Sequence, residues 1–260
     1  FPTRRSSDLL EQKSRLGFYV HIPFCPHICP YCDFVKTSKF TSLDINGYFK
    51  KLEESLDLFI QEINTKEIKT VTLYFGGGTP GIIPPKYYEV FIKKLKNFFD
   101  LEEVTIETNP FTNYKKFFEE YKKIGIDRIT LGAQSLCQNT LEFLGRKHSP
   151  QNILENIEWA KEIGFEQVQV DLIYGLKEGV RTLTVQEEIQ TLLQYGATGI
   201  SAYGLTLEKR TLFAETNNAD DDVAHNEYEA IVKTCLESGL RQIETSNFSF
   251  FQSKHNQLYW

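Results

Sequence analysis

Short apolar runs alternate with longer amphipathic segments along most of this 260-residue chain. The apolar runs are rich in Val, Ile, Leu, Phe and Tyr, a composition that is typical of β-strands. They lie at residues 18–22, 70–75, 104–107, 128–131, 167–173, 199–205 and 241–244. Between them, apolar residues recur three and four positions apart, which indicates helices with one buried face. This alternation predicts a parallel sheet whose strands are joined by helical crossovers.

The ends of the predicted helices carry clear sequence signals. Four helices run up to a glycine, the residue that best adopts the left-handed conformation just past a helix. These glycines are Gly125, Gly164, Gly196 and Gly239. Another signal is Ser149-Pro150, a capping residue followed by a first-turn proline. The aspartates at 220–222 are expected in the first turn of the last helix, where negative charge suits the helix dipole.

Polar and glycine-rich motifs recur at the carboxyl ends of the predicted strands. A cysteine-rich run follows the first strand, and Gly76-Gly77-Gly78-Thr79-Pro80 follows the second. Glu107 closes the third strand, Gln134 follows the fourth and Asp171 lies on the fifth. A doubly wound sheet gathers ligand contacts at one switch point, whereas a (βα) barrel collects them from several strand ends. We therefore predict an α/β fold with an incomplete TIM-like barrel of parallel strands.

Composition and charge narrow the class of protein. The chain carries 29 Lys and Arg against 35 Asp and Glu, a net charge of −6, so no basic field favours nucleic acid. No apolar run is long enough to cross a bilayer, and no secretory signal precedes the first strand. Three of the five cysteines are clustered, which argues against a disulfide framework and for a reducing compartment. We expect a cytoplasmic protein that does not bind nucleic acid.

The two ends of the sequence differ from the rest. The chain contains no methionine, and residues 1–15 lack hydrophobic periodicity, so we expect them to be a non-native or disordered extension. The last residues, Leu258-Tyr259-Trp260, are apolar and would normally be covered by more chain. We expect the sequence to be truncated in its C-terminal part.

Three cysteines in one short loop are the strongest chemical signal. Cys25, Cys29 and Cys32 are separated by three and two residues and follow an apolar strand. A [4Fe–4S] cluster held by three thiolates leaves one iron free for a small ligand, although four cysteines are the usual complement. The alternative is a zinc ion with His27 as the fourth ligand, because a structural zinc site needs four. No second Cys/His pair follows at zinc-finger spacing, so we favour the cluster.

The cysteine loop and its flanking Tyr19-Val-His-Ile-Pro-Phe24 resemble the cluster loop of radical S-adenosylmethionine (SAM) proteins. The subgroup that they resemble contains oxygen-independent coproporphyrinogen III oxidase and its relatives, and the similarity extends from about Leu16 to Trp260. The resemblance implies that the three cysteines hold a [4Fe–4S] cluster whose open iron is chelated by the amino and carboxylate groups of SAM. It also implies a partial (βα)6-type barrel over residues 16–208. Residues 209–260 would form a helix–strand extension that leads into a missing C-terminal domain.

The resemblance also assigns contacts to SAM. The stretch from Gly76 to Gly81 formally matches the dinucleotide motif G-x-G-x-x-G, but Pro84 and Pro85 postpone the helix that this motif needs. In the resembled family this stretch binds the methionyl amino end of SAM through backbone groups, and glycine permits that close approach. The implied SAM contacts are Tyr19, Tyr31, Gly77, Gly78, Thr79, Glu107, Gln134, Arg146 and Asp171. For Glu107 and Asp171, the alternative is a buried charge that is paired within the barrel.

The end of the sequence resembles a second motif of this family. His255-Asn256-x-x-Tyr259-Trp260 is similar to a pattern of the heme chaperone branch, where it has been tied to heme binding. Imidazole is a common axial ligand of heme iron. The resemblance therefore implies heme contacts at His255, Asn256, Tyr259 and Trp260. The alternative is a structural histidine beside two packed aromatic side chains, which is the more common role of a single histidine.

Two classes of function compete for this sequence. One is a heme chaperone that keeps the cluster and SAM and delivers heme to acceptor hemoproteins, whether free or membrane-bound. The other is oxygen-independent coproporphyrinogen III oxidase, which uses SAM for an oxidative decarboxylation in porphyrin biosynthesis. The oxidase has a fourth cysteine two positions after the third, where this chain has Phe34. We therefore favour the chaperone and assign no catalytic residue.

Some questions stay open at the level of sequence. A radical SAM enzyme with another substrate is a third alternative. The sequence does not determine the heme acceptor, the oligomeric state or whether SAM is cleaved during function.

Overall fold

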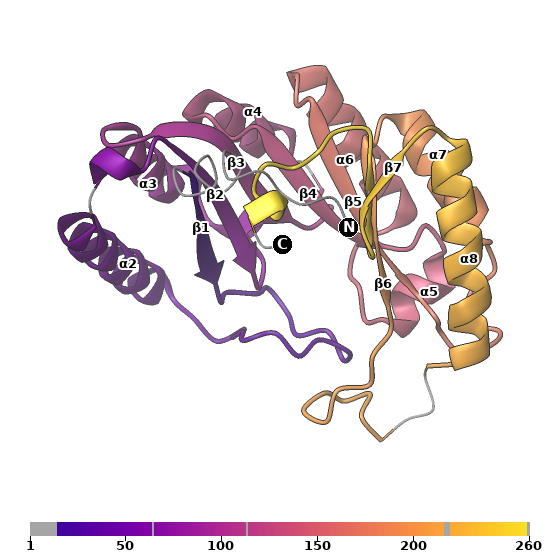
Figure 1. The fold of residues 1–260 in the computed structure, drawn as a ribbon. Helices are drawn as coiled ribbons and strands as arrows, with labels where there is room; N and C mark the ends of the chain where they lie inside the picture. Colours follow the sequence, from indigo (N-terminus) through magenta and orange to yellow (C-terminus); the bar gives the residue numbers. More distant parts are fainter. Residues whose placement is uncertain (1–14, 64, 113, 216–218, 259–260) are drawn as a thin grey trace.

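The computed structural model describes residues 15–63, 65–112, 114–215 and 219–258. Its strands form one sheet in the order β1-β2-β3-β4-β5-β6-β8-β7 (Figure 1). The strands are β1 Arg15–Ile22, β2 Thr70–Gly77, β3 Asp100–Thr108, β4 Arg128–Gln134, β5 Gln167–Tyr174, β6 Gly199–Gly204, β7 Arg241–Glu244 and β8 Asn247–Ser249. The α-helices are α2 Ser42–Glu62, α3 Pro85–Lys96, α4 Lys115–Ile124, α5 Gln138–Phe143, α6 Pro150–Ile163, α7 Val185–Tyr195 and α8 Asp221–Glu237.

The first six strands form the predicted incomplete barrel. Each neighbouring pair from β1 to β6 is parallel. The sheet is curled, and the helices lie along its outer side (Figure 1). All six strands point the same way, so their carboxyl ends gather at one mouth, where the sequence placed its unusual motifs.

The two faces of the sheet have opposite chemistry. Val71, Leu73 and Phe75 of β2 are at most 1% exposed and belong to the main core. Phe75 packs on Tyr88 of α3, with ring centroids 4.4 Å apart. The alternate positions, which face the inside of the curl, are mostly polar. They include Thr72, Tyr74, Glu103, Thr105, Glu107, Arg128, Thr130, Gln169, Asp171 and Ser201. Because TIM-barrel interiors are usually filled by branched apolar side chains, this interior is suited to polar ligands.

The helix-end signals are confirmed. Gly125, Gly164, Gly196 and Gly239 have φ angles of +94°, +93°, +112° and +84°. Ser149 forms a capping box with Asn152 at the start of α6. Asp220 caps α8, whose first turn contains two further aspartates. Local sequence therefore defines these boundaries.

The far edge of the sheet differs from the prediction. The run at 241–244 is a strand as expected, but it does not pair with β6. The short strand β8 lies between them, antiparallel to both β6 and β7. The strand β8 was not predicted. Its three residues are too few to show a period.

Several expectations about the ends lie outside the described residues. Residues 1–14 of the predicted extension are among them, as are Tyr259 and Trp260. Arg15 is the first residue of β1, one position before the predicted start of the barrel. Within the described ranges, we find no helix with the length and apolar character needed to span a bilayer. The division near residue 208 stays a prediction.

Candidate cofactor site at the carboxyl ends of the strands

The cysteine loop leaves the end of β1 and is folded back by hydrogen bonds. Cys25 N donates to Thr37 O at 2.9 Å. Lys36 Nζ donates to Cys32 O at 2.7 Å. Cys25 and Cys29 are buried, Cys32 is half-buried, and all three are free thiols. The loop thus holds three unpaired thiols at the mouth of the barrel.

The glycine-rich stretch after β2 packs directly on the cysteine loop. Gly78 N donates to Ile22 O at 2.7 Å, and Thr79 N donates to Phe24 O at 2.9 Å. Thr79 Oγ1 donates to Cys25 Sγ at 3.5 Å. A Cβ atom on Gly78 would lie 2.8 Å from Ile22 O and 3.0 Å from Cys25 Sγ. Only glycine fits here, so the second sequence motif is needed to support the first.

Polar donors surround the thiols. Arg146 Nη1 lies 3.4 Å from Cys29 Sγ, and His27 Nε2 lies 3.7 Å from the same sulfur. Burial raises the pKa of the Cys25 thiol, while the hydrogen bond from Thr79 lowers this pKa. Because the thiolate is the form that binds metals, the hydrogen bond from Thr79 favours the ligating state of Cys25 and acts against the effect of burial.

The described residues of this region form no preformed ligand set for a single metal ion. Among the residues that the structure describes, no three His, Cys, Asp or Glu side chains are grouped closely enough to hold one ion. The assignment of a cluster therefore rests on the donor set of the loop and on its sequence.

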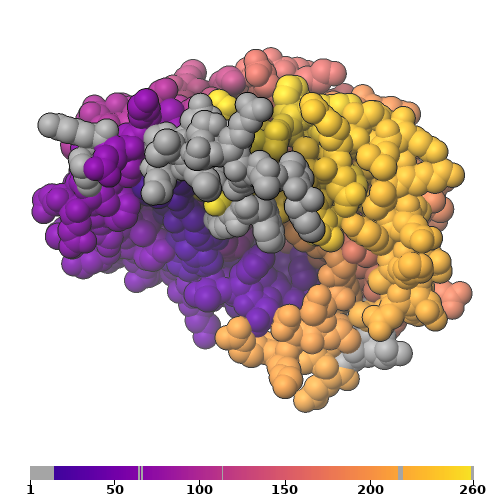
Figure 2. Space-filling model, viewed as in Figure 1, coloured from indigo at the N-terminus to yellow at the C-terminus, as the bar shows by residue number. Residues whose placement is uncertain are grey.

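A segment that follows β6 covers one side of the cysteine loop. Phe213 N donates to Pro30 O at 3.2 Å, and Arg210 pairs with Asp33 at 2.9 Å. Figure 2 shows this segment, in orange, beside the purple atoms of the N-terminal part. The Phe213 ring packs on Tyr31, with centroids 6.4 Å apart. Distant parts of the chain therefore meet around the cysteines.

Glu107 is held from two sides at the mouth. It accepts hydrogen bonds from the Tyr74 hydroxyl at 2.7 Å and from Gly77 N at 3.0 Å. A Cβ atom on Gly77 would lie 2.5 Å from the His21 ring, so this residue must be glycine. Although part of Glu107 reaches the open mouth, desolvation raises the pKa of its carboxyl group. Glu107 is thus hydrogen-bonded inside the barrel and also faces the glycine loop, and its assignment to SAM stays a prediction.

Asp171 is a second carboxyl group on the same face. Burial raises its pKa from 3.8 to about 7, and the charge of Glu107 acts in the same direction. Asp171 Oδ1 is buried and has no hydrogen-bond partner among the described residues. An unpaired buried oxygen costs free energy, so this atom is suited to accept a hydrogen bond from a ligand.

The stability of the protein should depend on pH through Asp171. The folded state raises the pKa of Asp171 from 3.8 to about 7, so it binds this proton more tightly than the unfolded state. The free energy of unfolding should therefore fall as pH rises from about 4 to 7, by up to about 1.4 kcal/mol per pH unit, and then level off. Urea denaturation between pH 5 and 8 gives the free energy of unfolding of the wild type and of Asp171→Asn. The difference between the two proteins at each pH measures the contribution of Asp171. Parallel pH profiles would show that Asp171 titrates normally.

Three polar side chains lie close to Gly132. They belong to Asn109, Gln134 and Arg146. Arg146 Nη2 donates to Asn109 Oδ1 at 2.6 Å and to Gly132 O at 2.8 Å. Gln134 has a φ of +69°, which is uncommon for a residue other than glycine. Gln134 Oε1 and Arg146 Nε are buried without hydrogen-bond partners among the described residues. Unusual backbone and unpaired polar atoms at one place are typical of a ligand site.

The two predicted tyrosine contacts lie in different surroundings. Tyr31 is half-buried and hydrogen-bonds to Arg146. Tyr19 is 46% exposed, and its ring stacks on Tyr74 with centroids 6.0 Å apart. The Tyr19 hydroxyl lies 3.2 Å from His21 Nδ1. Both tyrosines border the mouth, so their assignment to SAM stays a prediction that the geometry permits.

The terminal motif lies elsewhere in the barrel. His255 is 1% exposed, and its Nδ1 lies 2.7 Å from Thr72 Oγ1. Its ring stacks on Tyr74, with centroids 5.1 Å apart. Thr72 belongs to the first half of β2, whereas the cysteine and glycine loops follow the strand ends. The structure therefore does not bring His255 together with the cysteines.

A buried carboxylate fixes the backbone around His255. Glu103 is 2% exposed and accepts hydrogen bonds from Ser253 Oγ at 2.7 Å, Lys254 N at 2.9 Å and His255 N at 3.2 Å. Asn256 Nδ2 donates to Glu244 at 3.0 Å. The turn is thus docked by specific polar contacts rather than by apolar packing alone.

Two interior residues were not predicted as part of the site. They are Tyr74 and Glu103. A usable signal was present: Tyr74 lies two positions before Gly76, and Glu103 lies four positions before Glu107 on the same strand. Such even spacing places side chains on one face of a strand, so polar residues there share the interior with the predicted contacts.

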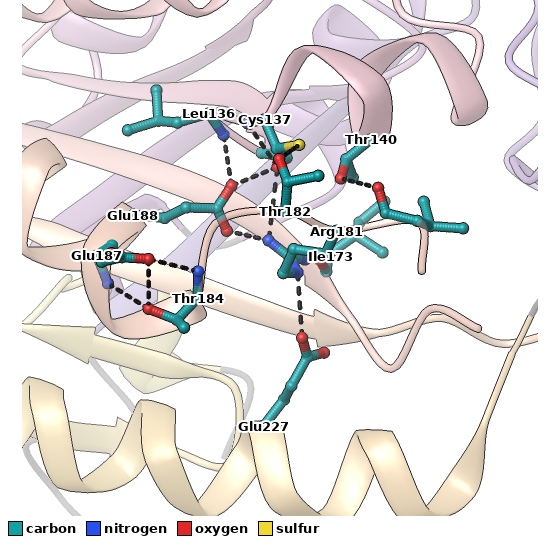
Figure 3. A network of polar contacts seen from close by, with 12 residues as sticks. Leu136, Cys137, Thr140, Ile173, Arg181, Thr182, Thr184, Glu187, Glu188 and Glu227 are labelled. Atoms are coloured by element: carbon teal, nitrogen blue, oxygen red, sulfur yellow. Dashed lines mark hydrogen bonds and ion pairs between the residues drawn. The ribbon is translucent and has the colours of Figure 1, made fainter. Parts of the chain in front are cut away.

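A buried ion-pair network holds the segments that follow β4 and β5 (Figure 3). Glu188 of α7 is fully buried, pairs with Arg181 and accepts a hydrogen bond from Leu136 N at 2.6 Å. Arg181 donates to Ile173 O at 2.5 Å and lies 3.1 Å from Glu227 of α8. These bonds fix the backbone just after Gln134 and Asp171. The network therefore helps to hold these two residues in position at the mouth of the barrel.

Comparison with known protein families gives one match that covers most of the barrel. The family described as the Radical SAM superfamily matches residues 19–184. This range includes the cysteine loop, the glycine loop and all the predicted SAM contacts.

Curated relatives at about 30% identity carry the name of a heme chaperone. The chain is 32% identical over 254 residues to the heme chaperone HemW of Lactococcus lactis, covering 93% of this chain and 65% of that protein. The identity to the heme chaperone HemW of Bacillus subtilis is also 32% over 254 residues, covering 93% and 66%. The predicted resemblance to the heme chaperone branch is confirmed. The chain spans 65% to 66% of the length of these two relatives.

Solved structures with low sequence identity share the fold. Coproporphyrinogen III oxidase from Escherichia coli superimposes with a TM-score of 0.75 at 20% identity, covering 96% of this chain and 60% of that one. Methylornithine synthase gives a TM-score of 0.54 at 12% identity, covering 86% and 63%. These likenesses support the partial barrel.

Proposed function

Since the family match shows that this chain belongs to the Radical SAM superfamily, we propose that it is a heme-binding chaperone that carries a [4Fe–4S] cluster and SAM. The observation that carries the proposal is a loop with three cysteines and no fourth. The position of the oxidase's additional cysteine is Phe34, which is 67% exposed. The names of the curated relatives agree with this choice.

The residues at the mouth fit the two cofactors. Cys25, Cys29 and Cys32 would hold the cluster, because they are free thiols on one loop. SAM would be held by the glycine loop and by the polar atoms that lack partners, on Gln134, Arg146 and Asp171. When bound, the cluster and SAM supply one-electron chemistry that protein side chains lack.

The chain's own residues orient these groups. Gly77 N and the Tyr74 hydroxyl fix both oxygens of Glu107, so the carboxylate cannot rotate away from the mouth. Arg146 places positive charge beside Cys29, which offsets the negative charge of the thiolates. Partial burial excludes bulk water and strengthens both effects.

Heme would bind through the terminal motif. His255 supplies an imidazole, the usual axial ligand of heme iron. This ring is 1% exposed and docked against Thr72 and Tyr74. The turn at 253–258 must therefore leave the barrel before the His255 imidazole can bind heme iron. Acceptor hemoproteins would then take the heme from this exposed motif.

A second candidate is oxygen-independent coproporphyrinogen III oxidase. The similarity of the fold to that enzyme favours it, with a TM-score of 0.75. Anaerobic turnover of coproporphyrinogen III with SAM and a reductant separates the two functions. Sustained formation of protoporphyrinogen would reverse our ranking, whereas heme transfer without turnover would support the chaperone.

Hemin titration tests the proposed heme ligand. We expect the wild type to give a Soret band, and His255→Ala to weaken hemin binding by at least about tenfold because the axial ligand is lost, a change of about 1.4 kcal/mol. His225→Ala is a matched control, since His225 is exposed on α8 and its side chain is 72% accessible. An unchanged spectrum and affinity in His255→Ala would contradict the axial role.

A further inference from the structure

The side chain of Tyr74 touches both the terminal turn and the cofactor mouth. Its ring stacks on His255, with centroids 5.1 Å apart and an interplanar angle of 29°. It also stacks on Tyr19, at 6.0 Å and 27°. Its hydroxyl donates to Glu107 Oε1 at 2.7 Å. One residue thus contacts the proposed heme ligand and a proposed SAM contact.

Close packing fixes where the Tyr74 ring can lie. A Cβ atom on Gly76 would lie 2.8 Å from Tyr74 Cε1, 2.9 Å from Glu107 Oε1 and 2.9 Å from Tyr19 Cε2. The three side chains therefore converge on a position that only glycine leaves free. A tyrosine hydroxyl moves with its ring, so a displaced ring would withdraw the hydrogen bond to Glu107.

The docked terminal turn supports this ring from the other side. Glu103 holds the turn through three hydrogen bonds, from Ser253, Lys254 and His255. The turn also lies against β1, where a Cβ atom on Gly17 would be only 3.3 Å from His255 Cε1. His255 therefore has a defined seat against Tyr74, and undocking would leave one face of the Tyr74 ring uncovered.

We propose that Tyr74 is a positioning residue that couples the docked state of the His255 turn to SAM binding. The docked turn holds the Tyr74 ring, the hydroxyl holds Glu107, and Glu107 is then oriented for SAM. Coupling between two sites is reciprocal, so bound SAM favours the docked turn and lowers the affinity of His255 for heme. The inference rests on the proposed function for the roles of Glu107 and His255.

SAM affinity tests the coupling without heme. On the full chain with reconstituted cluster, equilibrium dialysis compares the wild type, Tyr74→Phe, His255→Ala and the double variant. Tyr74→Phe keeps the ring and loses only the hydroxyl, and we expect SAM binding at least about fivefold weaker, the lower end of typical couplings. His255→Ala should weaken SAM binding too, and the double variant should match Tyr74→Phe alone, because both changes act through one bond. The control His225→Ala should bind SAM with wild-type affinity. The coupling would be overturned if Tyr74→Phe or His255→Ala left SAM affinity unchanged, or if the double variant lost the sum of the two single effects.

Hemin titration with and without SAM gives the reciprocal result. Saturating SAM should weaken hemin binding to the wild type by at least about fivefold. In Tyr74→Phe, SAM should leave the hemin affinity unchanged. An equal SAM effect in both proteins would contradict the role of Tyr74.

Glu107→Gln separates failure of the coupling from failure of the proposed function. If Glu107→Gln leaves SAM affinity unchanged, Glu107 is not a SAM contact, and both the proposed site and the coupling are wrong. If Glu107→Gln weakens SAM binding but Tyr74→Phe does not, only the coupling is wrong. The dialysis cycle decides the coupling even if hemin does not bind.

Discussion

Cys29→Ala is expected to lose the iron–sulfur cluster completely. The wild type should hold about four irons per chain after anaerobic reconstitution. Cys29 is buried in the loop, with Arg146 Nη1 at 3.4 Å from its sulfur, so alanine removes a ligand from the centre of the site. The two remaining thiolates, on Cys25 and Cys32, cannot retain a cubane that already has fewer than four cysteine ligands. Iron and sulfide analysis with visible absorption measures the result.

The chain offers a matched control for this substitution. Cys235 is also a buried free thiol, but it lies on α8, and burial raises its pKa to about 12. Cys235→Ala should therefore keep the full iron content. A complete cluster in Cys29→Ala would refute the assignment, and so would a wild type that takes up only zinc.

Glu188→Ala is expected to destabilise the fold by about 3–5 kcal/mol, because it leaves Arg181 as a buried charge without its main partner. Glu188 is fully buried, and the Arg181 side chain is 8% exposed. The substitution also removes the acceptor of Leu136 N. Chemical denaturation measures the loss, and SAM affinity should fall with it because the backbone after Gln134 is no longer held.

Two further variants separate the buried charge from a general effect on α7. Glu187 is the neighbouring residue on the same helix and accepts from Thr184 N at 2.8 Å in an exposed capping box. Glu187→Ala should therefore cost much less than Glu188→Ala. Replacing both Arg181 and Glu188 by apolar residues should restore much of the stability, since neither charge is then left unpaired. Equal losses in Glu187→Ala and Glu188→Ala would show that the ion pair contributes little.

Local sequence was sufficient for strands β1 to β7 and for the mouth of the barrel. Glycine at 125, 164 and 196 marks helix ends because a left-handed residue there has few alternatives. The cysteine and glycine loops could be placed at one mouth because parallel strands put their carboxyl ends together. Phe34 could be recognised only through the resemblance to the oxidase, which has a fourth cysteine two positions after the third.

Pairings between distant residues could not be predicted in this way. The contact between Arg146 and Cys29 joins residues 117 positions apart, and the one between Glu103 and His255 joins residues 152 apart. The short strand β8 was missed for the same reason, since its pairing with β6 and not its own pattern makes it a strand.

The sequence by itself determined an alternating α/β chain with a three-thiol loop and a glycine-rich loop, because these depend on residue type and spacing. Only the tertiary structure decided that Tyr74 joins Glu107 to His255 and that the terminal histidine is docked inside the barrel. The physical reason is that curling of the sheet sets which interior side chains meet, and this depends on the packing of all strands together.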